Sequence, residues 1–428
     1  MPPKISVTEQ ISRRVVITGI GLITPYAVGR EQSWHKLLTG HSATSLLQEL
    51  SNQLGRPIAG GIIPDSELSS ASLDRPPFQS DPAINLTLKA TCEAIEDAGL
   101  DRSQLSNEFA GCVIGSSKGG IAGYAELAAA SHRKSASHDS IPPEFWLQCL
   151  PHACSQAVAA EFGLQGAALT PVSACATGLS SIMRGADLIR DGICNTVIAG
   201  SADASLVPAV LSSFQRMGVL ATDFLSPAQA CKPYDSRRNG FVVGEGAGIM
   251  ILESLEHALE RNATPYAEWL GGGLGADSTH LMQFDPTAES LARLITDTLD
   301  RTRVSVEELD YVNLHGTGTQ INDLYETRAL QNALGEPAQS IPCSSLKGGM
   351  GHLLGAAGSV ELGFTLLAMR DNIVPPTVNL EHPDPQCNLN YTPRTAVSKS
   401  INTVLKLSFG FGGHLVAGLL RHWQPASR

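Results

Sequence analysis

The chain alternates short apolar runs with longer segments in which apolar residues recur every three or four positions. The run 14–19 is typical of a buried strand that ends in a glycine turn, whereas 83–99 has one apolar face and a terminal glycine, typical of a capped helix. We expect further strands and helices at 112–115, 176–192, 196–201, 289–303, 309–314 and 355–370. This alternation predicts an α/β fold with a mostly parallel sheet covered by helices.

No low-complexity tract, charge block or proline-rich linker divides the chain, so any domains must share a core. An apolar strand leading into a glycine or threonine turn occurs near 17–21 and again near 312–319, which is a weak internal repeat. The stretch 145–183 has Glu161 as its only formal charge. We therefore expect this stretch to be buried on several sides, by the core and by a second subunit.

The amino-acid composition disfavours several classes of function. The chain has 428 residues, 43% of them hydrophobic, which suits a globular protein with a large core. Its net charge of −11 disfavours general binding to nucleic acid or anionic membranes. Its nine cysteines are scattered and never form C-x-x-C pairs, so we expect neither a disulfide framework nor a zinc site. No signal peptide or membrane span is evident, and we expect a cytoplasmic protein.

The sharpest candidate for chemistry is Cys175, in the segment 172–179, where a strand-like run leads into a helix. A cysteine at a helix N-terminus lies at the positive end of the helix dipole, which favours the nucleophilic thiolate. An isolated cysteine is more often a buried structural residue. The cysteine alone therefore leaves both interpretations open.

Two histidines lie in glycine-rich segments, His315 in 313–319 and His352 in 347–358. Glycines beside a histidine let a ligand approach the backbone, which suits acid–base or oxyanion chemistry. A third glycine-rich segment, 408–414, ends at His414 and could direct backbone N–H groups at an oxyanion.

Taken together, these segments resemble the β-ketoacyl-ACP synthases, particularly the type II elongating enzymes of fatty acid and polyketide synthesis. The resemblance extends from 13–25 through 238–248 to the Phe-Gly-Phe-Gly-Gly loop. It implies the thiolase fold, a five-layered α-β-α-β-α unit built from two similar halves and usually dimeric. We place the two halves at 1–262 and 263–428.

The resemblance also implies roles for individual residues. Cys175 is the nucleophile that carries the acyl chain as a thioester, and His315 and His352 stabilise the enolate formed when malonyl-ACP loses carbon dioxide. The N–H groups of Cys175 and Phe411 form the oxyanion hole. The remaining implied roles belong to the active-site lysine Lys347, the supporting acids Glu361, Asp323 and Glu326, and the gate and acyl-pocket residues Phe411, Phe409 and Lys118. No cofactor and no metal are implied.

The implied partners are acyl-carrier protein and a second subunit, in a homodimer or a heteromer. An acidic carrier protein would need a basic patch on this acidic chain. We expect that patch among Arg133, Lys134, Arg216, Arg237 and Arg238.

Several residues depart from the family pattern. Lys118 stands where the elongating enzymes usually place an apolar residue, and an unpaired lysine would oppose a long saturated chain. The other departures are Leu407, His414, Gly318 and Gln320. Primary fatty acid synthesis and a specialised polyketide or unusual-lipid pathway therefore both remain open.

Other function classes have weaker support in the sequence. The segment 115–119 fits G-x-S-x-G, which would make Ser117 the nucleophile of a serine hydrolase. A dinucleotide site after the first strand is rejected, because Thr24 stands in place of the third glycine. A non-catalytic scaffold subunit would lack the nucleophile, whereas this chain retains Cys175.

Overall fold

The main sheet has ten strands in the order β11-β10-β14-β15-β9-β1-β8-β6-β4-β5. The structure is a computed structural model and describes residues 13–64, 81–132, 147, 149–392 and 394–424. The strands of this sheet are β1 (Val15–Ile23), β4 (Ala110–Gly115), β5 (Ala168–Leu169), β6 (Thr196–Asp203), β8 (Gly246–Ser254), β9 (Ala267–Ala276), β10 (Tyr311–Asn313), β11 (Cys343–Ser344), β14 (Thr403–Gly410) and β15 (His414–His422). Two smaller sheets contain β2 (Ser45–Leu46), β3 (Ala59–Gly61) and β7 (Val243–Gly244), and β12 (Ile373–Val374) with β13 (Val397–Ser398).

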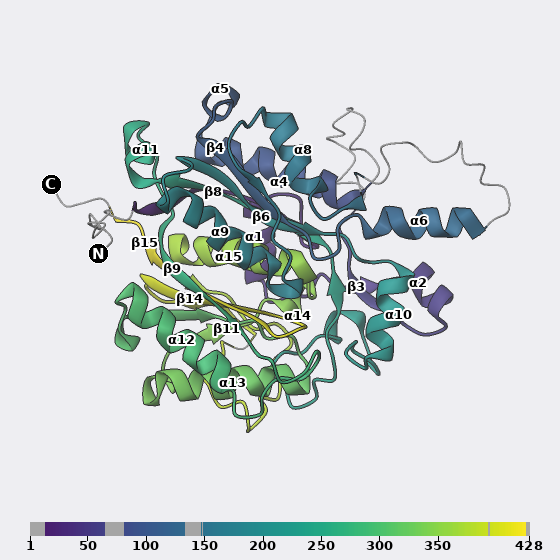
Figure 1. The fold of residues 1–428 in the computed structure, drawn as a ribbon. Coiled ribbons are helices and arrows are strands. Elements are labelled where there is room, and N and C mark those ends of the chain that lie inside the picture. Colours follow the sequence, from purple (N-terminus) through teal and green to yellow (C-terminus); the bar gives the residue numbers. More distant parts are fainter. Residues whose placement is uncertain (1–12, 65–80, 133–146, 148, 393, 425–428) are drawn as a thin grey trace, which may run out of the picture.

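Helices cover both outer faces of the strands and fill the space between the two halves of the sheet (Figure 1). One outer layer contains α4 (Pro82–Ala98) and α8 (Ala153–Phe162), and the other contains α12 (Glu289–Thr302) and α13 (Gln320–Leu334). The central helices α9 (Thr177–Arg190) and α15 (Ala357–Asp371) contact strands of both halves. The remaining helices are α1 (Arg30–Leu38), α2 (Gln48–Leu54), α5 (Arg102–Leu105), α6 (Ile121–His132), α10 (Pro208–Arg216), α11 (Leu255–Glu260) and α14 (Lys347–Met350). This arrangement is the predicted five-layered α-β-α-β-α unit.

The two halves of the sheet repeat one pattern. From β1 through β8, β6 and β4 to β5, two antiparallel pairings are followed by two parallel ones, and the same sequence runs from β9 through β15, β14 and β10 to β11. The expectation of a mostly parallel sheet was therefore wrong. Direct connections such as the short turn between β14 and β15 produce antiparallel neighbours, whereas helical crossovers produce parallel ones.

This symmetry also corrects the internal repeat expected from the sequence. By position in the sheet, β1 corresponds to β9, and β10 corresponds to β4. The segments 17–21 and 312–319 belong to β1 and to the end of β10, so they do not occupy equivalent positions. The two segments are similar because each contains glycine, not because they occupy equivalent places in the two halves.

The glycines of β1 do not form the predicted turn. Gly19 and Gly21 lie inside the strand, which continues to Ile23. A Cβ added at Gly19 would lie 2.2 Å from the carbonyl oxygen of Ala94, and one at Gly21 would lie 1.8 Å from that of Ala90. Helix α4 thus packs directly on the strand backbone, which only glycine permits.

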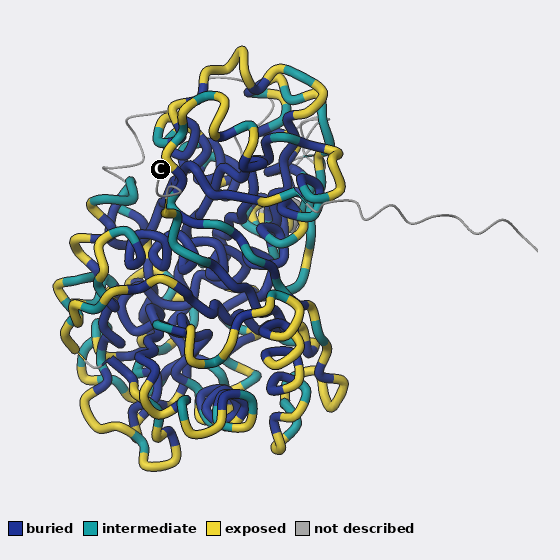
Figure 2. Tube along the Cα trace, turned by 90° about the vertical axis from the view of Figure 1, so that its left-hand side faces the viewer, coloured by how far each residue is buried: buried dark blue, intermediate teal, exposed yellow. Residues whose placement is uncertain are grey.

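The other predicted strands and helices are confirmed, with ends that differ by at most two residues. Buried residues follow the central layers, and exposed residues lie on the outer helices and loops (Figure 2). The predicted division at 262/263 falls in the connection between α11 and β9 and stays a prediction. No helix in the described part of the chain has both the length and the apolar character to cross a bilayer.

Candidate active site

The candidate nucleophile Cys175 lies in a 3-10 turn that leads directly into α9 and is 6% exposed. The preceding residue, Ala174, has a φ of 48°, which side-chain-bearing residues rarely adopt. Gly410 of β14 packs against this turn, and a Cβ added there would lie 2.6 Å from the carbonyl oxygen of Ser173. The glycine of the Phe-Gly-Phe segment therefore brings that strand into contact with the turn that carries the cysteine.

Burial dominates the acidity of Cys175. It raises the pKa of the thiol to about 11, although the positive charges of Lys118 and Lys347 and the N–H of Phe411 act in the opposite direction. At neutral pH the resting side chain is therefore a thiol, in contrast to the thiolate that the helix dipole suggested. The N–H of Phe411 points at this side chain, as an oxyanion-hole donor would.

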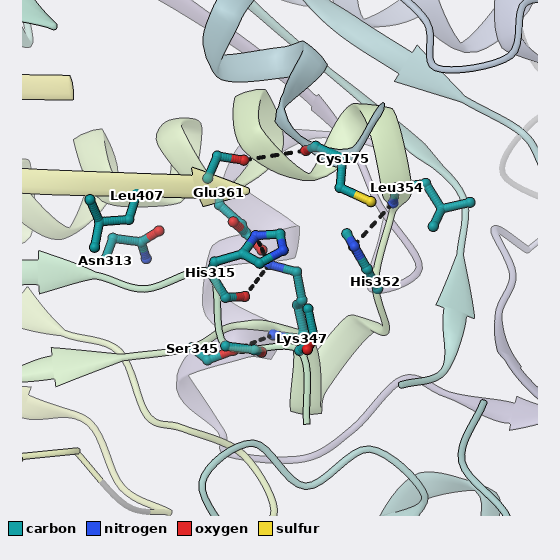
Figure 3. A network of polar contacts seen from close by, with 12 residues as sticks. Cys175, Asn313, His315, Ser345, Lys347, His352, Leu354, Glu361 and Leu407 are labelled. Carbon is teal, nitrogen blue, oxygen red and sulfur yellow. Dashed lines mark hydrogen bonds and ion pairs between the residues drawn. The ribbon is translucent and has the colours of Figure 1, made fainter. Parts of the chain in front are cut away.

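His315 and His352 face each other beside the cysteine. Their ring centroids are 5.4 Å apart with planes at 85°, and Figure 3 shows the sulfur of Cys175 directed into the space beside the two rings. Burial lowers the pKa of both histidines well below the usual value, and the charge of Lys347 lowers it further. Both rings are therefore neutral at pH 7.

The hydrogen bonds of the two rings indicate where each neutral histidine carries its proton. Nδ1 of His352 accepts a hydrogen bond from the N–H of Leu354 at 3.2 Å. Nδ1 of His315 lies 3.5 Å from the ammonium nitrogen of Lys347, a group that can only donate. In both rings the proton thus belongs on Nε2, which makes the rings a pair of hydrogen-bond donors.

Lys347 links His315 to a buried carboxylate. Its ammonium donates to the backbone carbonyl of His315 and to Oε1 of Glu361, the latter at 2.5 Å (Figure 3). Both Lys347 and Glu361 are fully buried. The family resemblance paired these two residues, and the structure brings them together.

Asp323 and Glu326, at the start of α13, are also fully buried and not on an exposed turn. Glu326 accepts hydrogen bonds from the N–H groups of His315 and Gly316 at 2.7 and 2.8 Å. Asp323 accepts one from the N–H of Gly318 at 3.1 Å. The two carboxylates therefore fix the backbone of the glycine-rich histidine loop.

A cavity of about 510 Å³ opens onto these groups. Its lining includes Cys175, His315, His352, Phe409 and Phe411. The Phe409 ring lies 5.0 Å from the His315 ring, centroid to centroid, and holds it from one side. One cavity thus exposes a thiol, two imidazole donors and the Phe-Gly-Phe segment together.

Lys118 does not belong to this lining. Its ammonium donates to Ser117 Oγ at 2.7 Å, lies 4.0 Å from Asp203 and is 5.9 Å from the ring centroid of Phe214. Phe214 packs in the apolar cluster that also contains Cys175. Lys118 therefore lies against this cluster, and its side chain is 25% exposed.

Ser117 has the wrong partners for a hydrolase. Its hydroxyl donates to the buried carboxylate of Asp203 and accepts from Lys118. A serine nucleophile needs a base, usually histidine, to take its proton. The G-x-S-x-G match is therefore a chance match.

The predicted docking patch is corrected in part. Arg238 is 4% exposed and binds Asp384 at 2.6 Å, so it is a buried structural residue. Arg133 and Lys134 lie outside the described residues. Arg216 and Arg237 are exposed, and Arg216 directly precedes cavity-lining residues.

Lys406 was missed from the sequence. It is fully buried on β14, and its ammonium lies 2.7 Å from Oε2 of Glu361, the oxygen that Lys347 leaves free. The available signal was a lysine between leucines in the middle of an apolar strand, Leu405 and Leu407 being its neighbours.

Comparisons with known proteins agree with this geometry. Residues 12–258 match the family model "Beta-ketoacyl synthase, N-terminal domain", and 266–381 match "Beta-ketoacyl synthase, C-terminal domain". The chain is 34% identical to the tetracenomycin polyketide synthase ketoacyl synthase alpha subunit of Streptomyces glaucescens, over 96% of this chain and 98% of that one. It is 35% identical to 3-oxoacyl-[acyl-carrier-protein] synthase 2 of Coxiella burnetii, over 94% and 96%.

One solved structure is similar to this chain over nearly its whole length. The AntDE:AntF complex is described as a type II polyketide acyl-carrier protein with its ketosynthase bound to the hexaketide. The match has a TM-score of 0.88 and 30% identity and covers 96% of this chain and all of the matched chain.

Proposed function

Because this chain belongs to the β-ketoacyl synthase family, we propose how its residues divide the steps of the condensation that the family catalyses. The chain is a 3-oxoacyl-[acyl-carrier-protein] synthase, an acyltransferase. The observation that carries the proposal is the single cavity that Cys175, His315 and His352 line together.

In the first half-reaction, the Cys175 sulfur attacks the thioester carbonyl of an acyl carrier. The carrier thiolate leaves and takes up the proton that the cysteine gives up, and the acyl chain remains on Cys175. Because burial keeps Cys175 protonated, the thiol must lose its proton during the attack, and the departing carrier thiolate is the group that takes it up.

In the second half-reaction, malonyl-ACP binds with its thioester oxygen at the Nε2–H groups of His315 and His352. The bond to its carboxylate breaks, carbon dioxide leaves, and the electron pair forms an enolate that the two donors stabilise. The enolate carbon attacks the acyl carbonyl on Cys175. The oxyanion that forms accepts from the N–H groups of Cys175 and Phe411. When the oxyanion collapses, the Cys175 thiolate leaves and takes up a proton from solvent.

We further propose that the acyl chain is short or carries oxygen substituents. The Lys118 ammonium supports this, because a long saturated chain in the cluster around Cys175 would remove water from the charge without replacing its hydrogen bonds. Carbonyl or hydroxyl groups could accept from it. The alternative is that the enzyme extends long saturated chains. The relatives do not discriminate between the two substrate classes, since the polyketide enzyme and the 3-oxoacyl-[acyl-carrier-protein] synthase are about equally similar to this chain.

For partners, we propose acyl-carrier protein and a second subunit. The exposed Arg216, which directly precedes cavity-lining residues, supports carrier docking. The edge strand β5 and the half-exposed Val172, both in an almost uncharged stretch, support a subunit interface. The second subunit is another copy of this chain or a related chain, since one relative is an alpha subunit. The halves 1–262 and 263–428 and a cytoplasmic location remain part of the proposal, the latter supported by nine free cysteines.

The test is a competition experiment with purified protein, malonyl-ACP and two acyl carriers, one with a long saturated chain and one with a short 3-oxoacyl chain. Mass spectrometry of the products and of the acyl group on Cys175 should show preferential use of the oxoacyl chain. Preferential use of the saturated chain would contradict the proposed substrate class. The C175A variant should form no product with either carrier, and turnover by it would contradict the proposed roles.

A further inference from the structure

Two buried lysines bind one buried carboxylate behind the histidine pair. Lys347 contacts Oε1 of Glu361 at 2.5 Å, and Lys406 contacts Oε2 at 2.7 Å. Lys406 also donates to the carbonyl oxygen of Leu407 at 2.8 Å. All three side chains are fully buried, so two ammonium groups share one carboxylate.

The charge of Glu361 does not require a second lysine. Lys347 already neutralises Glu361, and removing a further cation from water has a cost that one shared carboxylate repays only in part. Lys406 projects from β14 on the face opposite to Leu405 and Leu407, and an apolar side chain there would carry no such cost. The presence of a second lysine on a carboxylate that is already paired therefore needs an explanation other than folding.

The position of Lys406 links it to the reacting groups. Through Glu361 it acts on Lys347, which binds the backbone of His315 and faces its Nδ1. Two residues further along β14, Ser408 binds the carbonyl oxygen of Cys175 at 3.2 Å. Lys406 thus contacts none of the cavity-lining groups itself but is connected to them from two sides.

We propose that Lys406 is a positioning residue for the condensation. It fixes Glu361 so that Lys347 stays against His315, and its charge keeps His315 and His352 in the neutral form that donates from Nε2. This inference rests on the proposed roles of the two histidines.

The charges around the histidine pair set the direction of the effect. The groups that face it are Cys175, Lys118, Glu326, Lys347, Glu361 and Lys406. Burial and the charge of Lys347 are the main causes that lower the pKa of both histidines, and the charge of Lys406 lowers it further. Without that charge the pKa of each ring rises, protonation persists to higher pH, and the acid limb of the rate profile moves to higher pH.

The experiment measures two half-reactions of the intact enzyme between about pH 4 and pH 9, because burial moves the titration of both histidines below the range in which histidine ordinarily titrates. One is release of carbon dioxide from malonyl-ACP, and the other is acylation of Cys175 by acyl-ACP. The variants are K406M, K406Q and K406R, with K399M as the matched control. Lys399 is only partly buried and binds the carbonyl oxygen of Asp310, away from the cavity.

For K406M we expect decarboxylation to fall by roughly tenfold or more and its acid limb to move up by about one pH unit. Acylation should fall by less than about threefold, since it does not need the enolate stabilised. K406Q should show the same shift, which keeps the test valid if K406M does not fold. K406R retains the positive charge, so the acid limb of its decarboxylation rate should lie at the same pH as in the wild type. The same is expected of K399M.

An unshifted limb in both neutral variants would overturn the inference. So would equal losses in the two half-reactions, because a merely structural lysine would affect both alike. Failure of the underlying function is recognised separately in H315A and H352A. If these two variants still decarboxylate malonyl-ACP at the wild-type rate, the proposed histidine roles are wrong, whatever the Lys406 variants show.

Discussion

The hydroxyl of Ser408 donates a hydrogen bond to the carbonyl oxygen of Cys175 at 3.2 Å. It joins β14, which leads into the Phe-Gly-Phe segment, to the turn that carries the nucleophile. Because Phe411 follows three residues after Ser408, this bond helps to set where the Phe411 N–H lies relative to the cysteine. The geometry of the oxyanion hole thus depends on a contact between two distant parts of the chain.

Removing this contact should reduce catalysis more than stability. In S408A we expect condensation to fall by roughly tenfold, in line with partial misplacement of an oxyanion donor. The free energy of unfolding should fall by about 1 kcal/mol, the usual net value of one buried hydrogen bond. Steady-state rates and denaturant unfolding measure the two effects. S400A, at an exposed serine, is the control, and an unchanged rate in S408A would show that the bond does not position the donor.

Gly410 tolerates no side chain. In G410A the new Cβ would lie 2.6 Å from the carbonyl oxygen of Ser173 and 3.1 Å from the backbone nitrogen of Cys175, so the nucleophile turn must move. We expect condensation to fall by about a hundredfold or more, because misplacement by about 1 Å has effects of that size.

The matched control for G410A is G275A on β9. A Cβ at Gly275 meets only ordinary contacts with Leu294, the nearest at 3.4 Å, and should leave the rate unchanged. Thermal unfolding of both variants separates misfolding from misplacement. A rate for G410A equal to that of G275A would contradict the close packing of the two segments.

The buried thiol predicts a pH dependence for alkylation. Because burial raises the pKa of Cys175 to about 11, only about one molecule in a thousand carries the thiolate at pH 8. Iodoacetamide labelling of Cys175 should therefore accelerate through that range and level off only near pH 11. Peptide mapping by mass spectrometry measures it, with the exposed Cys92 as internal reference.

Lys118 should contribute to this reactivity, since its charge lowers the pKa of Cys175. In K118M the pKa rises, and labelling at pH 8 should slow by several-fold while Cys92 is unaffected. Labelling of Cys175 that levels off below about pH 8 in the wild type would contradict the raised pKa.

The position of Lys118 also predicts that removing its charge changes the substrate specificity. In K118L the charge beside Phe214 is removed, and a long saturated chain no longer has to desolvate it. The ratio of kcat/KM for a long saturated acyl carrier to that for a short 3-oxoacyl carrier should rise by at least about tenfold. Competition assays measure this ratio directly. A ratio equal to that of the wild type would show that the lysine does not contact the acyl chain.

Glu326 should be needed for the histidine loop. Its carboxylate accepts from the N–H groups of His315 and Gly316 and from the hydroxyl of Tyr234. In E326Q the amide has a single acceptor oxygen, so at least one buried donor is left unpaired, at a cost of about 1–3 kcal/mol. The free energy of unfolding and the condensation rate should both fall, whereas E336Q, a helix-start glutamate on the surface, should match the wild type. Denaturant unfolding and steady-state rates measure the two effects.

Much of this protein is determined by local sequence. The helix at 83–99 was predictable because its apolar period, its Asp81 cap and its terminal Gly99 are all local features. The nucleophile and both histidines were found through motifs that the family resemblance joined. Glycine next to each histidine was the visible signal there, because close approach of a ligand to the backbone requires it.

Only the tertiary structure decided how these groups behave. The helix position of Cys175 suggested a thiolate, but burial by distant segments outweighs it and yields a thiol. Arg238 resembled a surface charge in the sequence, whereas Asp384 and Asp323 enclose it in the fold. Lys406 had no motif, because its meaning comes from Glu361, which is far away in the chain. Motifs depend on neighbours along the chain, whereas protonation and charge balance depend on neighbours in space.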